Sequence, residues 1–492
     1  MRFLRNAILP ICGCLLSVTV FSQDNHYEGL QLGSKNALLS GAAVSKWVDQ
    51  TAVVINAATM MNAQEAGITF NTTTGSLDNI VFRNGLGDDL DIKTSNAQLH
   101  PGLIAADLPI LKDEANNRMG ISIFRRIDDR TRFTSREEYM QNIIDDAEAP
   151  GMETFIGQYV LDIELTETTA ALGWATRLSP TWSAGLATMA HFRSHRYREN
   201  FSAAAVADPA FNPAVDLVSA ESDISLKASF ALLQIRGSLA WQSGPWNAGF
   251  VLTLPSIRVW SDGDMIAEAS LVNIKPDSLS ERKSYLASAF LDKQKPVFRY
   301  PVSVSAGVSR SFGAVTVSTS ASWYGAVDRY VVIDPGDTPY LQPPSSENIL
   351  YTQRFLEVWS SNRSLVNGAV SGEWTTSPRL SLMAGFRTDL HYAQFFDPLP
   401  PGFQLPKKIW NRYHVNFGAA FSNRFSRWIV GLQYSYGHAD NYRQPYSLDN
   451  AGEGNLLQGE RETGTIYQNG LTGVLSFLFF VDRERTIRKP DE

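Results

Sequence analysis

Apolar and polar residues alternate along two adjoining stretches of the chain between residues 365 and 392. In the second stretch one parity is largely apolar and comprises Leu380, Leu382, Ala384, Phe386, Leu390 and Tyr392. The other parity is mostly polar or small and comprises Ser381, Met383, Gly385, Arg387, Asp389 and His391. This period-two alternation predicts a strand with one apolar face. Because strands of soluble sandwiches usually have about five or six residues, longer arms joined by a short turn at residues 376–379 indicate a transmembrane β-barrel.

The same pattern, a short turn between long alternating arms, recurs along the chain. Turns are expected at residues 112–117, 179–181, 243–245, 311–313, 376–379 and 423–426. Together with a first strand near residues 67–74 and a last near 466–481, they predict fourteen strands, the even number of a closed bacterial barrel. The opposite connections are predicted to be long polar loops, at residues 75–97, 136–156, 201–220, 262–296, 333–363, 397–409 and 442–463. This asymmetry places the short turns in the periplasm and the loops outside.

Aromatic and charged residues indicate which face of each strand meets lipid. Bulky rings lie next to the short turns and predict an inner aromatic girdle, formed by Trp182, Trp246, Phe312, Phe425 and Trp428. An arginine on the lipid face at the bilayer midplane costs about 2–4 kcal/mol. The lumen is therefore expected to hold the charged and polar residues of the strands, among them Arg193, Arg387, Asp389 and His391.

The first 22 residues have the anatomy of a secretory signal peptide. A basic start is followed by an apolar run from Ala7 to Phe21, and small residues precede a predicted cleavage after Ser22. A lipoprotein leader acylated at Cys14 is the alternative, although it would divide the apolar run. Both cysteines of the chain, Cys12 and Cys14, lie in this leader, so the mature protein is predicted to have no disulfide and no thiolate metal site.

Composition narrows the function classes further. Removing the leader's two arginines lowers the formal net charge from −7 to −9, which argues against a nucleic-acid partner. No later segment has the apolar length of a membrane-spanning helix. Residues 482–492 form a charged end that we predict to be a solvated periplasmic tail.

Residues 23–66 precede the first predicted strand and do not alternate. Short helical runs broken by Gly33 and Gly41 suit a plug packed inside a barrel. The segments at residues 33–42 and 49–58 resemble the N-terminal hatch of the long-chain fatty acid transporter (FadL) family. That family carries an Asn-Pro-Ala triplet just before its first strand, and Asn56, Ala57 and Ala58 occupy the matching place, with alanine in place of the proline.

The resemblance implies passive uptake of hydrophobic molecules across the outer membrane. It also implies capture in an apolar groove among the outer loops, and a hatch whose movement opens a way out, often sideways into the membrane. Transfer of an alkyl chain from water to such a groove gains roughly 0.8 kcal/mol per methylene. Two apolar loops are expected to form the groove, through Phe201, Val206, Phe211, Leu217, Met265, Ile266, Leu271, Leu286 and Phe290. In the second of them, a capping-box pattern at residues 278–281 precedes apolar residues at helical spacing.

Metal binding and catalysis find little support in the sequence. His191 and His195 fall on one face of a strand but lack a third ligand nearby. Ser381 shares a face with Asp389 and His391, yet it lies about 26 Å from Asp389 at ~3.3 Å per residue. No nucleophile elbow and no phosphate-binding glycine loop is present.

The sequence therefore predicts an all-β protein, a fourteen-stranded antiparallel transmembrane barrel over residues 67–481 with a helical hatch over residues 23–66. We expect a monomeric outer-membrane channel that takes up a hydrophobic small molecule, contacts outer-membrane lipid, and has no catalytic activity, metal or cofactor. Three alternatives stay open: a non-transporting scaffold such as the related secretion proteins of gliding bacteria, an outer-membrane lipid hydrolase, and an open porin.

Overall fold

The computed structural model describes residues 26–28, 31, 33–63, 66–108, 111, 113, 115–275, 281–336, 356–394, 403–404 and 408–480. The predicted leader, the charged tail at 482–492 and most of the capping-box pattern at 278–281 lie outside these residues. No helix in the described part has both the length and the hydropathy needed to cross a bilayer.

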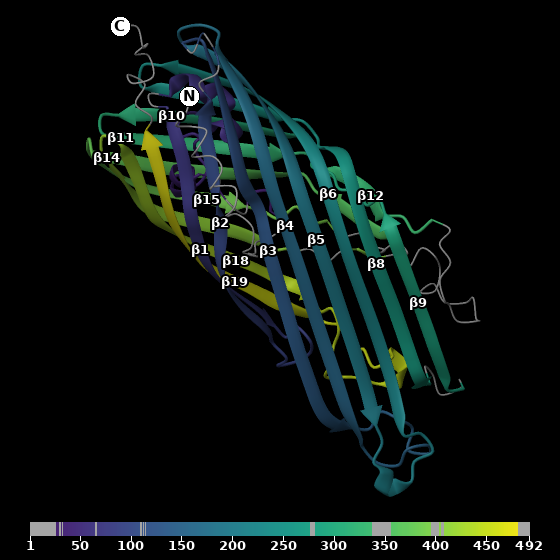
Figure 1. Ribbon diagram of the computed structural model, residues 1–492. Coiled ribbons are helices and arrows are strands. Elements are labelled where there is room, and N and C mark those ends of the chain that lie inside the picture. Colours follow the sequence, from purple (N-terminus) through teal and green to yellow (C-terminus); the bar gives the residue numbers. More distant parts are fainter. Residues whose placement is uncertain are drawn as a thin grey trace.

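Fourteen antiparallel strands close into a barrel, as predicted (Figure 1). In chain order they are β1 (Gly67–Arg83), β2 (Ile92–Leu108), β3 (Asn117–Gln141), β4 (Glu153–Arg177), β5 (Trp182–Val206), β6 (Leu217–Ser243), β7 (Trp246–Thr253), β10 (Ser303–Phe312), β11 (Val315–Tyr324), β14 (Leu365–Ser377), β15 (Leu380–Asp389), β17 (Asn411–Ser422), β18 (Ser426–Arg443) and β19 (Thr463–Phe480). Each strand pairs with the next, and β19 pairs with β1 from Gly67↔Phe480 to Arg83↔Thr465.

The predicted short turns all connect neighbouring strands, because period-two alternation and turn residues are local signals. Around these turns the large aromatic side chains are exposed on the outer surface: Trp182, Trp246, Phe312, Trp374, Phe425 and Trp428. On β15, Leu382 and Phe386 face outward while Arg387 and Asp389 are fully buried inside. An apolar exterior around a charged interior is the arrangement expected of a membrane barrel.

Several strands are much longer than a membrane requires. β3, β4 and β5 have 25 residues each and β6 has 27, so each is about 80–90 Å long at ~3.3 Å per residue. Together with β8 (Ile257–Ile274) and β9 (Lys283–Gln294) they form a sheet that projects beyond the rest of the barrel (Figure 1). Much of the predicted loops at 136–156, 201–220 and 262–296 is therefore strand, and so is most of the predicted loop at 75–97, where β1 and β2 continue.

The prediction of helical spacing at residues 285–291 is also wrong. These residues belong to β9, where Ala287, Ala289 and Leu291 face the interior and Leu286 and Phe290 face outward. The four large apolar side chains of this stretch are too few to distinguish a helical period from a strand period, and pairing with β8 selects the strand.

The N-terminal segment, residues 33–63, lies inside the barrel at the end with the short turns (Figure 1). Its helices are short: α2 (Ser34–Leu38), α3 (Ala52–Ile55) and the 3-10 helix η1 (Ala57–Asn62) have five, four and six residues. The remainder is turns, so the expectation of a helical domain is not met. α2 contacts β15, β17, β18 and β19, whereas η1 contacts β3 to β6. The segment therefore reaches from one side of the bore to the other.

A small second sheet lies beyond the barrel ladder. It comprises β12 (Val327–Ile333), β13 (Val358–Asn362) and β16 (Phe403–Gln404). Two further 3-10 turns are η2 (Pro209–Phe211) and η5 (Glu453–Asn455).

Candidate functional site

Wall glycines make room for the N-terminal segment. Nine of them would place a Cβ atom against residues 38–60 of the segment: Gly67, Gly120, Gly173, Gly185, Gly249, Gly307, Gly385, Gly418 and Gly431. At Gly249 that atom would lie under 3.0 Å from the Val44 carbonyl oxygen. Several of these glycines occupy the polar parity of strongly alternating strands. A glycine on the lumen-facing side of a strand indicates that another part of the backbone approaches closely, and the sequence interpretation did not use this signal.

Asn56 cross-links the segment to itself and to the wall. Its fully buried side-chain amide donates to the Val44 carbonyl at 2.8 Å and to the Leu239 carbonyl of β6 at 3.1 Å. Its Oδ1 accepts from the Ala58 amide at 3.1 Å, and Ala58 also donates to Ser238 Oγ at 3.1 Å. The residue singled out through the family triplet thus joins both halves of the segment to β6.

A proline at position 57, as in the family triplet, would fit this geometry. Ala57 is the first residue of η1, a position whose N–H no helical turn satisfies, and Asn56 before it is extended at φ −154°, ψ 96°. Proline is favoured at the first position of a helix, and the residue before a proline prefers an extended backbone. We expect Ala57→Pro to preserve the fold and to raise stability by up to about 1 kcal/mol, because proline restricts the unfolded chain. Thermal unfolding in detergent measures this, and a clear loss of stability would contradict it.

Charged side chains hold the opposite end of the segment. Lys35 Nζ lies 2.6 Å from Glu373 Oε1 and Lys46 Nζ lies 3.1 Å from Glu373 Oε2, so one carboxylate of β14 binds two lysines. Near β1 and β2, Gln50 donates to Asp107 at 3.3 Å and accepts from Thr69 Oγ1 at 2.7 Å. These contacts attach the segment to the barrel wall on several sides.

The wall itself is interrupted between β2 and β3. Their ladder runs only from Ile104↔Ile123 to Leu108↔Met119, although both strands continue beyond Ile104↔Ile123, away from the short turns. Beyond it, one bond crosses among the described residues, from Asn96 Nδ2 to the Arg130 carbonyl at 3.3 Å. We call this interval the β2–β3 seam.

On the inner side of the β2–β3 seam the surroundings are apolar. Leu103 and Phe124, the residues just above the last paired rung, pack in one buried cluster with Val53 and Met60 of the N-terminal segment. The seam thus lies directly beside the segment that fills the bore.

Above the N-terminal segment, buried charges line the interior. Glu167 Oε1 lies 3.2 Å from Arg126 Nη1 and 3.0 Å from His191 Nδ1, and Glu167 Oε2 accepts from Arg193 at 3.4 Å and from the Tyr300 hydroxyl. Arg193 therefore lies in the lumen. His191 binds a carboxylate, and within the described ranges no three His, Cys, Asp or Glu side chains gather as a metal site.

A second buried network surrounds Asp389. Its carboxylate lies 2.6 Å from Arg412, 3.3 Å from His26 and 3.4 Å from His414, while neighbouring Arg387 donates to the Glu28 carbonyl at 2.5 Å. His391 lies beyond the end of β15, and its carbonyl accepts from Arg363 Nε at 2.9 Å.

The Asp389 network contains a triad-like order that the sequence did not reveal. His414 Nδ1 lies 2.7 Å from Ser435 Oγ, and the other ring nitrogen faces Asp389. The three residues come from three different strands, β15, β17 and β18, so no local motif marks them. Gln433 also donates to Ser435 Oγ at 3.2 Å and Arg412 engages the carboxylate, which makes this a packed polar network of the wall.

A polar cavity of about 150 Å³ remains between the N-terminal segment and the wall. Its lining is rich in hydroxyl, amide and guanidinium groups, including Arg126, Gln234, Arg236, Ser303, Ser305, Ser320, Ser322 and Asn367. Arg236 donates to the Val54 carbonyl and, through Nε, to Thr253 Oγ1 at 3.0 Å.

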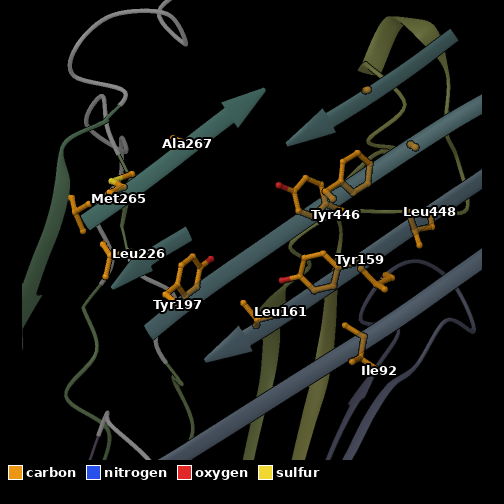
Figure 2. Close-up of a cluster of buried hydrophobic side chains, with 14 of the residues drawn as sticks. Ile92, Tyr159, Leu161, Tyr197, Leu226, Met265, Ala267, Tyr446 and Leu448 are labelled. Atoms are coloured by element: carbon orange, nitrogen blue, oxygen red, sulfur yellow. The ribbon is translucent and has the colours of Figure 1, made fainter. Parts of the chain in front are cut away.

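The expected ligand-capture residues do not form one groove. Phe201 and Met265 are buried in the interior cluster of the projecting sheet, and Leu271 packs against that cluster. The exposed members are Val206, Phe211, Leu217, Ile266, Leu286 and Phe290. They separate because the two stretches are strands, whose successive side chains point to opposite faces. Figure 2 shows the interior cluster, with Tyr446 and Leu448 over the strands that carry Tyr159, Leu161 and Tyr197.

The loop between β18 and β19, residues 444–462, covers this apolar inner face. Tyr446 stacks on Phe201 at 4.1 Å between ring centroids, and Tyr139 donates to the Leu448 carbonyl at 2.7 Å. Glu453 binds Arg282 at 2.6 Å, and Arg282 also reaches Glu148 in the loop between β3 and β4. Partial burial would raise the pKa of Glu148, but hydrogen bonds and charge from Arg282 and Lys275 outweigh it and hold that pKa below its usual value.

No protein-family model and no curated protein matches this sequence. Solved structures match its fold. A FadL homologue of Pseudomonas aeruginosa is 12% identical over 92% of this chain and 99% of its own, with a TM-score of 0.54. The toluene transporter TodX of Pseudomonas putida is 13% identical over 93% and 100%, also at 0.54. The fold is that of the FadL-type channels.

The toluene transporter TbuX of Ralstonia pickettii shares the FadL-type fold as well, at 11% identity, a TM-score of 0.50 and coverage of 93% of this chain and 99% of its own. All three are transport proteins rather than enzymes. A closed barrel with an apolar exterior fits an outer-membrane location.

Proposed function

We propose that this chain is a monomeric outer-membrane channel for passive uptake of hydrophobic small molecules, long-chain fatty acids or similar lipophiles. The leader at residues 1–22 would direct its export. The N-terminal segment would act as the hatch, and the bilayer would receive the cargo. The proteins that share its fold include a FadL homologue and two toluene transporters, which supports a lipophilic cargo here.

The β2–β3 seam is the observation that carries the proposal. The open ladder lies beside an apolar cluster that includes residues of the N-terminal segment. A lipophile could therefore leave sideways through the wall and would not have to cross the polar interior. Movement of Val53 and Met60 with the hatch would expose Leu103 and Phe124 to a molecule inside. The route ends in lipid, which is where a hydrophobic cargo is most stable.

Capture would take place on the inner face of the projecting sheet. That face is apolar and is covered by residues 444–462, so a lipophile that displaces Tyr446 from Phe201 enters an apolar site already shielded from water. Of the residues expected from sequence, Phe201, Met265 and Leu271 belong to this site.

The experiment that tests the function is uptake of a labelled long-chain fatty acid by cells with and without the protein, combined with a disulfide across the β2–β3 seam. Leu103→Cys/Phe124→Cys continues the register of the last rung, and the predicted mature chain has no other cysteine. We expect oxidation to lower uptake well below the rate of the native protein, and reduction to restore it. The matched control is Ala106→Cys/Ile121→Cys, a pair within the intact ladder. Equal uptake with and without the protein would contradict the function, and an unaffected oxidised variant would contradict the exit.

A further inference from the structure

A second interruption of the wall lies between the strand pairs β7–β8 and β9–β10. The β7–β10 ladder ends at Thr253↔Ser303, and the β8–β9 ladder starts only at Gly263↔Gln294. The stretches between them, residues 254–262 and 295–302, are described in full and form no ladder with each other. They contain Pro255, Pro296 and Pro301, which have no N–H to donate. We call this interval the β7–β10 seam.

Only a few bonds cross the β7–β10 seam among the described residues. Ser256 N donates to the Tyr300 carbonyl at 3.4 Å, and Tyr300 N donates to Ser256 Oγ at 2.9 Å. Arg258 Nη1 reaches the carbonyls of Lys295 and Pro296 at 3.0 and 3.1 Å. One backbone bond and the side chains of Ser256 and Arg258 thus replace the regular backbone ladder.

The polar cavity meets the seam from inside. Thr253, Tyr300 and Pro301 line the cavity, and Gln234 Nε2 donates to the Leu254 carbonyl at 3.0 Å. Arg236 offers the cavity a guanidinium that pairs with no carboxylate of the described chain. The one carboxylate residue of the cavity lining, Glu28, accepts from the Tyr324 hydroxyl at 3.0 Å and makes no ion pair with Arg236 among the described residues, so an anionic group that enters beside Arg236 meets an uncompensated cation.

The outer side of the seam is apolar. Leu254, Ile257, Val259 and Trp260 are 44%, 60%, 69% and 55% exposed, so residues of both parities present apolar surface. With ~3.3 Å per residue and a tilt of about 40°, Leu254 lies roughly 25 Å above the short turn at Gly244, at the outer edge of an apolar band about 25 Å tall. At this level a tail reaches lipid while a head group stays beside polar atoms.

Tyr300 closes the seam from the lumen. Its hydroxyl donates to Glu167, lies 3.3 Å from Arg193 Nη1, and its ring lies 4.3 Å below the guanidinium carbon of Arg126. Tyr300 belongs both to the cavity lining and to the seam, so a change of its rotamer would widen the cavity at the seam.

We propose that the β7–β10 seam is a second lateral portal, through which a single-chain amphiphile with an anionic head group passes between the polar cavity and the outer leaflet. The head group binds Arg236, and the tail lies against Ile257, Val259 and Trp260. The portal rests on the proposed uptake function but is separate from the β2–β3 seam, from which it is several strands distant around the barrel.

The first test is Ser256→Cys/Tyr300→Cys, whose two residues face each other across the seam. In the reduced variant the two cysteines are not bridged and the Tyr300 ring is absent from the seam. Uptake of a fluorescent long-chain fatty acid by this form is expected to exceed that of the native protein. Oxidation bridges the seam and is expected to lower uptake about twofold below the native rate, as when one of two parallel exits closes. The control Leu252→Cys/Val304→Cys bridges a rung of the intact ladder on the lipid face and should respond to neither treatment. Equal uptake by the oxidised and reduced forms of the seam variant overturns the portal.

The second test reports binding alone and separates the portal from the uptake function. A photoactivatable fatty acid, with the alcohol of equal chain length as comparison, is added to the native protein in nanodiscs. Labelling of residues 254–260 by the acid, lowered in Arg236→Gln while labelling by the alcohol is unchanged, supports the portal even if native cells show no uptake. Absence of label from residues 254–260 overturns it even if uptake proceeds.

Discussion

Gly249→Ala is expected to loosen the N-terminal segment and to let ions and water pass through the bore. The added Cβ would lie under 3.0 Å from the Val44 carbonyl oxygen and from Asn56 Nδ2, two atoms already bonded to each other. A backbone carbonyl cannot rotate away as the end of a flexible side chain can, so the segment must move. Overpacking of this kind costs about 1–3 kcal/mol, and breaking the Asn56 bond adds to it.

Single-channel conductance in planar bilayers measures this effect. The native protein is expected to show small, rare openings, and Gly249→Ala larger and more frequent ones. Gly372→Ala on β14 is the matched control, because no atom lies within 4 Å of its added Cβ. A native-like conductance trace for Gly249→Ala would show that the segment does not seal the bore where Val44 meets β7.

The barrel was predictable because its signals are local. The turn at Thr376 to Arg379 and the alternation around Arg387 are contained within a few residues, and the membrane enforces them by excluding charge from one face. The projecting sheet was not predictable in the same way. Beyond the membrane both faces of a strand can be polar, so the outer halves of β4, β5 and β6 look like loops until their mutual pairing is known.

The site was predictable only in part. Asn56 was found through its resemblance to a family triplet, and the wall glycines stood on the polar parity where they could have been noticed. The buried networks were out of reach, since Glu167 meets Tyr300, and Asp389 meets His26, across most of the chain. Polar residues of a lumen carry no signal that says which partner they will face.

The two seams illustrate another limit. A ladder is a property of two strands and their register, so neither β2 nor β3 shows by its own sequence that the pairing stops at Ile104↔Ile123. At the β7–β10 seam the three prolines were a signal, because proline is tolerated only where a ladder bond is absent. The sequence interpretation placed only Pro296 in a predicted loop, at residues 262–296, and gave none of the three prolines a role.

Asn56→Ala is expected to release residues 52–62 from the wall while the barrel stays closed. The change removes two donated bonds and one accepted bond, and it leaves the Val44 and Leu239 carbonyls buried without that donor. An unsatisfied buried group costs about 1–3 kcal/mol, so the loss is about 2–4 kcal/mol for the segment. Since every 1.4 kcal/mol is tenfold in an equilibrium, amide hydrogen exchange of residues 52–62 should accelerate roughly a hundredfold.

Hydrogen-exchange mass spectrometry on protein in detergent resolves the segment from the strands. Asn423→Ala provides the comparison, because Asn423 Oδ1 accepts from the Phe425 and Ser426 amides at 2.8 Å each in a turn on the rim. That variant loses a similar number of bonds away from the bore, so its exchange should rise at the turn and stay native over residues 52–62. If Asn56→Ala exchanged like the native protein there, the packing of Val53 and Met60 rather than the Asn56 amide would be what holds the segment in place, and gating would have to begin at the β2–β3 seam.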